Sequence, residues 1–92
     1  MMIEMECLIK GRVTGVMFRD FVSRRARRLG LFGTVENVAR GQVRVVAQGE
    51  RTQLEQLVSC LKRGSILSRV DSVEVVERPI ETPRFTDFHI LH

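Results

Sequence analysis

Residues 3–29 read IEMECLIKGRVTGVMFRDFVSRRARRL, and the spacing of their apolar residues changes once along this stretch. Over 3–9, apolar and charged residues alternate, with Glu4 and Glu6 on one side and the opposite side formed by Ile3, Met5, Cys7 and Ile9. A period of two predicts a strand with one buried face. Beyond it, the apolar residues recur at helical spacing, at Phe18, Val22, Ala26 and Leu29. They predict a helix that Gly30 ends.

In the middle of the chain, the apolar residues follow first the period of a strand and then the spacing of a helix. Residues 33–38 and 42–48 read as strands, and the three residues between them suit a hairpin loop with Gly41 in a left-handed conformation. Gly49 and Glu50 lead into a second helix that ends at Gly64. Thr52 and Glu55 have the spacing of a capping box at its start. Its apolar stripe consists of Leu54, Leu57, Val58 and Leu61.

The last third of the chain predicts one long strand and one short one. Residues 70–77 alternate as a fourth strand, and Pro79 and Pro83 bracket an irregular link. Residues 85–91 add a short last strand, with Phe88 and Ile90 facing inward.

The order strand, helix, strand, strand, helix, strand is the split βαβ, or ferredoxin-like, pattern. It predicts an α+β sandwich in which two helices cover one face of an antiparallel sheet. The length of 92 residues suits one domain, and no repeat or linker divides residues 1–92.

Composition narrows the classes of function. Fifteen basic residues against 11 acidic ones give a net charge of +4, which favours an anionic partner. No apolar run approaches the roughly 20 residues that span a bilayer, and the N-terminus has no signal-peptide pattern. We therefore expect a cytoplasmic protein without a membrane segment.

The cysteines and histidines indicate no disulfide framework and no metal site. Cys7 and Cys60 read as reduced thiols. A disulfide between them remains an alternative, because strand and helix pack together. The only histidines, His89 and His92, are at the C-terminus, which argues against a His triad or zinc site.

The segment GRVTGVMFR, residues 11–19, joins the first strand to the first helix. A tight glycine-containing loop that enters a helix presents several backbone N–H groups, and such a nest binds anions with help from the helix dipole. Arg19 adds a planar, permanently charged guanidinium group that can donate hydrogen bonds to two phosphate oxygens. The segment is neither a Walker A loop nor a dinucleotide fingerprint. From the spacing alone, an ordinary connection with a surface arginine remains the alternative.

Taken with the rest of the chain, this segment resembles the signature of the acylphosphatase family. Residues 27–31 (RRLGL) and 33–37 (GTVEN) are similar to the family's helix end and following strand, and residues 69–73 and 88–90 fit its later strands. The resemblance runs in order along nearly the whole chain, and the family's fold is the one predicted above.

The resemblance implies hydrolysis of acyl phosphates to a carboxylate and inorganic phosphate, without metal, cofactor or covalent intermediate. The family's catalytic arginine corresponds to Arg19 and its catalytic asparagine to Asn37. The backbone that holds the phosphate corresponds to Thr14, Gly15, Val16, Met17 and Phe18. This chemistry needs no strong acid because the leaving carboxylate is stable without a proton, and positioning with charge stabilisation is sufficient. We expect a monomer whose partner is a small acyl phosphate.

The chain departs from the family pattern at a few positions. Thr14 stands where the family often has Gln, and Thr34 where it often has Trp. Asp20 directly follows Arg19, and successive helix residues project about 100° apart, so we expect its charge to point away from the phosphate. None of these departures changes Arg19 or Asn37.

Two alternatives to catalysis remain. One is a domain that binds an acyl phosphate or a partner protein without turnover; the presence of both Arg19 and Asn37 disfavours it. The other is a nucleic-acid-binding module that uses the basic helix face of Arg24, Arg25, Arg27 and Arg28. We expect this face to be solvated instead, as runs of charge on a helix usually are. Residues 3–9 and 42–48 contain no aromatic side chain on which bases could stack, which argues against an RNA-binding sheet.

Overall fold

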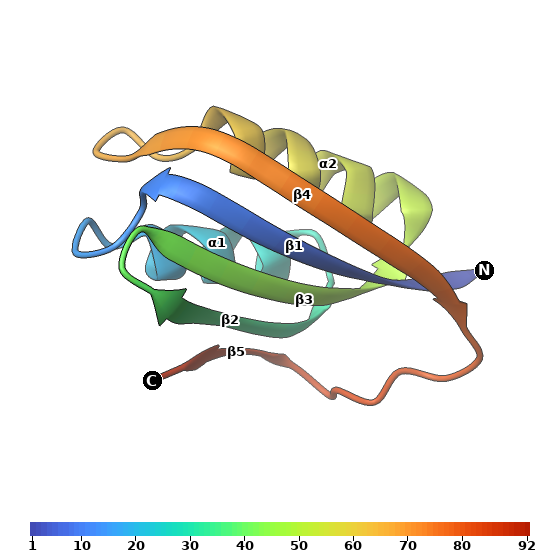
Figure 1. Ribbon diagram of the computed structural model, residues 1–92. Helices are drawn as coiled ribbons and strands as arrows, with labels where there is room; N and C mark the ends of the chain where they lie inside the picture. Colours follow the sequence, from blue (N-terminus) through green and yellow to red (C-terminus); the bar gives the residue numbers. More distant parts are fainter.

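The computed structural model describes residues 1–92 as a sheet with both helices on one face (Figure 1). The elements are β1 (Met2–Arg12), α1 (Phe18–Arg28), β2 (Phe32–Ala39), β3 (Gln42–Glu50), α2 (Arg51–Arg63), β4 (Arg69–Ile80) and β5 (Phe88–Leu91). The predicted α+β, ferredoxin-like order of strands and helices is confirmed. Neither helix is long and apolar enough to cross a membrane.

The sheet is mixed rather than antiparallel throughout. Its order is β4-β1-β3-β2-β5, and every neighbouring pair is antiparallel except β2 and β5. The prediction of an antiparallel sheet was wrong for this last pair. The link over 81–87 carries the chain from the end of β4 across to the start of β2, so β5 begins where β2 begins and runs beside it (Figure 1).

The core lies between the sheet and the helices, and the predicted inward faces form it. Fully buried residues include Cys7 and Ile9 of β1, Val22 of α1, and Leu57 of α2. Leu29 and Val58, which belong to the predicted helix stripes, are only partly buried. Cys7 and Cys60 are both buried and both free, so the disulfide alternative is not realised. Burial, followed by the negative charge of Glu6, raises the pKa of the Cys7 thiol to about 12.

Several elements are longer than the periodicity predicted, because backbone pairing continues after the apolar pattern stops. β1 runs through Gly11 to Arg12 across a register shift. Gly11 has φ 145, and a Cβ there would clash with the carbonyl oxygen of Arg69 on β4. Pro79 lies inside β4 rather than in a link, because an edge strand needs ladder hydrogen bonds on one side only. The last strand is shorter than expected, four residues from Phe88.

The predicted capping box of α2 is wrong. α2 begins at Arg51 directly after β3, Glu50 is the N-cap residue, and no side chain caps the helix. Thr52 therefore already lies within the first turn, where it cannot act as the N-cap. The predicted ends do hold: Gly30 and Gly64 follow the two helices with φ 72 and 75, and Gly41 has φ 74 in the hairpin.

Glu4 also differs from the sequence prediction. The sequence predicts it on the open face of β1, yet its side chain is buried and the residue is only 6% exposed. Its two carboxylate oxygens accept hydrogen bonds from Gln48 Nε2 at 2.7 Å, Arg84 Nε at 3.0 Å, and Arg78 at 3.1 and 2.6 Å. Burial alone would raise the pKa of Glu4, but the hydrogen bonds from Arg84, Gln48 and Arg78 outweigh it and lower the pKa below 4.5. Gln48 Oε1 also accepts the backbone N–H of Arg84 at 2.9 Å. This network holds the link over 81–87 against the open face of the sheet.

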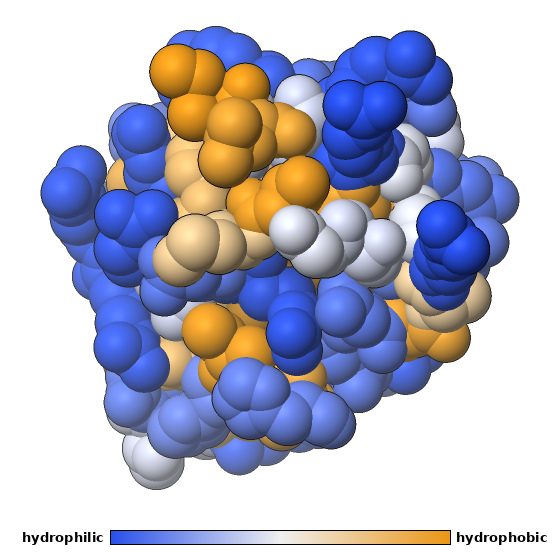
Figure 2. Space-filling view, turned by 90° about the vertical axis from the view of Figure 1, so that its left-hand side faces the viewer, coloured by the Kyte–Doolittle hydropathy of each residue, from blue (hydrophilic) through white to orange (hydrophobic).

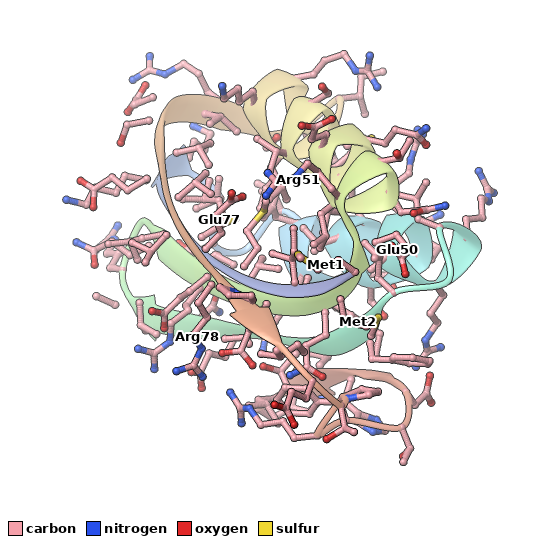
Figure 3. All side chains as sticks on the ribbon, turned by 90° about the vertical axis from the view of Figure 1, so that its right-hand side faces the viewer. Met1, Met2, Glu50, Arg51, Glu77 and Arg78 are labelled. Atoms are coloured by element: carbon pink, nitrogen blue, oxygen red, sulfur yellow. The ribbon has the colours of Figure 1, made fainter.

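Exposed ion pairs lie at the end of the molecule where β1 starts (Figure 3). The N-terminal ammonium of Met1 lies 3.1 Å from Glu50, and Arg51 lies 2.8 Å from Glu77. Such exposed pairs contribute little stability, typically about 0–1 kcal/mol. The opposite end carries the β1–α1 loop, the β2–β3 hairpin and the turn between α2 and β4 (Figure 1).

Candidate active site

Sheet topology brings the predicted site residues to one end of the molecule. β1 and β2 are both antiparallel to β3, so they run in the same direction and finish at the same end. The loop that enters α1 follows β1 there, and Asn37 lies near the end of β2. β5 runs parallel to β2, which places Leu91 at this end as well (Figure 1). Gly11 N–H donates to the Gly41 carbonyl at 3.0 Å and joins the hairpin to the end of β1.

The β1–α1 loop is held by buried residues on both sides. Val13 and Phe18 are each 1% exposed and belong to the core, whereas Gly15 and Met17 between them are exposed. Gly15 has φ 73 and Met17 has φ 60, so both adopt the left-handed conformation. Glycine takes that conformation at no steric cost, but a residue with a long side chain does so at a cost of about 1 kcal/mol or more. The loop therefore holds its shape against local backbone preference at Met17.

The loop's backbone N–H groups are free. None of those from Thr14 to Phe18 donates a hydrogen bond to another group of the protein. The last of them opens α1, where the first N–H groups of a helix have no intrahelical acceptor and lie at the positive end of the helix dipole. Five consecutive unpaired donors ahead of a helix can bind an anion.

Arg19 is the second residue of α1 and is partly buried. Its Nη1 donates to the Leu91 carbonyl at 3.3 Å, and no carboxylate pairs with it. The neighbouring Asp20 lies 3.1 Å from Arg24, one turn further along α1, as expected for a charge that points away from the loop. Arg19 thus remains available to a bound anion.

Asn37 lies on the face of β2 that the helices cover. Val35, two residues earlier, is fully buried, and Asn37 stands opposite Val43, which is also fully buried. Asn37 itself is exposed, and its amide makes no hydrogen bond within the protein. The pairing of β2 with β3 shifts register immediately after it. Asn37 and the N-terminus of α1 therefore share both a face and an end of the sheet.

Sequence reasoning missed what β5 contributes to this end. The Leu91 carbonyl contacts Arg19, and the Phe88 carbonyl accepts hydrogen bonds of 3.1 and 2.9 Å from Arg27. Arg27 therefore binds β5 and does not simply belong to a solvated helix face. No local pattern indicates these contacts, because backbone carbonyls more than 60 residues away provide the acceptors.

The chain is similar to known acylphosphatases along most of its length. The acylphosphatase family profile matches residues 5–90. An acylphosphatase of Methanococcoides burtonii is 42% identical over 92% of this chain and 88% of its own length, and one of Thermus thermophilus is 48% identical over 74% and 77%. The crystal structure of acylphosphatase from Bacillus subtilis superposes with a TM-score of 0.91 at 32% identity, covering 98% of this chain and 99% of that one. The chain therefore belongs to the acylphosphatase family of hydrolases.

Proposed function

We propose that this protein hydrolyses the carboxyl–phosphate bond of small acyl phosphates without a metal ion or other cofactor. The observation that carries the proposal is the row of unpaired backbone N–H groups from Thr14 to Phe18, directly followed by an arginine with no carboxylate partner. Such donors, fixed before the ligand arrives, stabilise the charge on a transferring phosphoryl group. The chain's family membership supports the same chemistry.

In the proposed reaction, the loop from Thr14 to Phe18 and the Arg19 guanidinium hold the phosphoryl oxygens. The side-chain amide oxygen of Asn37 accepts a hydrogen bond from the attacking water and so orients it. The water oxygen forms a bond to phosphorus as the bond to the acyl oxygen breaks, and the bonding pair leaves with the carboxylate. The phosphate receives the water's proton. Attack and departure are roughly in line, and catalysis is mostly positioning and charge stabilisation.

Hydrolysis of benzoyl phosphate tests this proposal directly. We expect turnover that EDTA does not change, and a loss of at least about 10²-fold in kcat for Arg19→Ala and for Asn37→Ala. Arg51→Ala is the matched control, since Arg51 is an exposed arginine at the opposite end of the molecule. Near-normal turnover in either site variant would remove that residue from the mechanism, and loss of activity with EDTA would contradict metal independence.

A folded wild type that hydrolyses no acyl phosphate would instead favour a domain that only binds one, or that binds a partner protein. Nucleic-acid binding is disfavoured, because Arg24 is paired with Asp20 and Arg27 with the backbone of β5. We further propose that residues 1–92 act as one domain and as a monomer in the cytoplasm. Sedimentation of the purified chain checks the oligomeric state.

A further inference from the structure

A groove of about 450 Å³ opens beside the phosphate loop, between α1 and the turn that leads into β4. Its apolar lining comes from the loop, from α1 and from the turn: Val16, Met17, Phe21, Ile66 and Leu67. Ile66 is 99% exposed and Leu67 65%, although both are large aliphatic residues. Figure 2 shows hydrophobic residues gathered at this end of the molecule. Contiguous exposed apolar surface is uncommon on soluble proteins and often marks a binding site.

The charged residues that line the groove are all basic. They are Arg24, Arg25 and Arg28. Arg24 is paired with Asp20, but Arg25 has no carboxylate partner and lies 5.4 Å over the Phe21 ring. Phe21 is four residues, or about 6 Å along the helix, beyond Met17. The free charge of Arg25 therefore lies about one helical turn from the loop, beside the apolar side chains of the groove.

In-line transfer of the phosphoryl group places the acyl half of the substrate on the side of the phosphate loop where this groove lies. The attacking water and the leaving acyl oxygen lie on opposite sides of phosphorus. Asn37 is on β2, and the strand order β4-β1-β3-β2-β5 puts β2 and β4 on opposite sides of β1, which leads into the phosphate loop. A leaving group that points away from Asn37 points toward the turn before β4. The groove is there, and Val16 and Met17 belong to both the loop and the groove.

We propose that this groove is the subsite for the acyl group and that it favours bulky apolar acyl groups carrying an anionic substituent. The proposal rests on the proposed function, because it assigns the other half of the same substrate. Val16, Met17, Ile66 and Leu67 contact the apolar body of the acyl group, and Arg25 pairs with its distal anion.

The apolar part of the proposal is tested by comparing benzoyl phosphate with acetyl phosphate. The variant is the double substitution Ile66→Ser and Leu67→Ser, whose exposed positions make it safe for folding. We expect kcat/KM for benzoyl phosphate to fall about fivefold relative to acetyl phosphate, since apolar contact with the ring is lost. Val76→Ser is the matched control, because Val76 is 69% exposed but lies on the open face of the sheet. An unchanged ratio in the double variant would overturn the proposal.

The anionic part is tested with 4-carboxybenzoyl phosphate. We expect Arg25→Gln to lower kcat/KM for this substrate about fivefold relative to benzoyl phosphate, with a smaller effect at high salt. An equal change for both substrates would refute a role for Arg25 in recognising the anion. Failure of the proposed function is distinguishable from either result, because the wild type would then hydrolyse none of the three substrates, acetyl phosphate included.

Discussion

The substitution Glu4→Gln tests whether the buried carboxylate stabilises the fold by holding the link over 81–87. It keeps the size of the side chain but replaces one accepting oxygen with an NH2 group that donates. Arg78 then loses its two hydrogen bonds, or Arg84 and Gln48 lose theirs. A hydrogen bond to a charged group contributes about 1.5–3 kcal/mol. Because the Arg78 and Arg84 side chains are 66% and 57% exposed and regain water, we expect a total loss near the low end, about 2 kcal/mol.

The assay is urea unfolding followed by far-UV circular dichroism, since the chain has no Trp or Tyr to report by fluorescence. In a thermal scan of the same signal, a loss of about 2 kcal/mol corresponds to a fall in Tm of about 10 °C for a protein of this size. Glu6→Gln is the control. Glu6 lies two residues further along the same face, is 53% exposed and is 3.9 Å from Arg44, so we expect a loss below about 0.5 kcal/mol.

The pH dependence gives a second readout. The pKa of Glu4 is lowered in the folded protein, so the unfolded chain binds more protons once the pH falls toward 4.5. The stability that ionised Glu4 provides is therefore present at neutral pH and is lost as the pH falls through the lowered pKa. The difference between wild type and Glu4→Gln should therefore stay constant near neutral pH and shrink once the pH falls below about 4.5. Equal destabilisation by Glu4→Gln and Glu6→Gln at neutral pH would refute the reasoning.

Three further predictions follow from the fold and the site. Replacing both Arg12 and Arg40 with Gln should raise KM at low salt only, because exposed charges steer an anionic substrate over distances that salt screens; Michaelis constants that match wild type at every ionic strength would disprove steering. Gly11→Ala should cost about 2 kcal/mol or more in unfolding free energy, as its Cβ meets the Arg69 carbonyl. Cys7 should resist alkylation at about pH 8 until the protein unfolds, since its thiol is fully buried with a pKa of about 12; rapid labelling of Cys7 in the native protein would contradict the structure.

Local sequence determined the elements and their inward faces. The period-two run from Ile3 to Ile9 and the helical recurrence from Phe18 reflect side-chain geometry that holds wherever a strand or helix forms, so they could be predicted without coordinates. The glycines at 30, 41 and 64 mark turns for the same local reason, and all three have positive φ. Arg19 and the loop before it could be singled out because a glycine-containing entry to a helix presents free N–H groups in any fold.

Tertiary structure decided everything that depends on residues far apart in the chain. The burial of Glu4, the inclusion of Pro79 in an edge strand and the parallel pairing of β5 follow from which strands became neighbours, and no local period encodes that choice. The contact of Arg19 with a carbonyl 72 residues away, and the placement of Asn37 on the same face and end as the loop, arise in the same way. Local sequence specifies which groups are available, whereas only the folded sheet brings them to one end of the molecule.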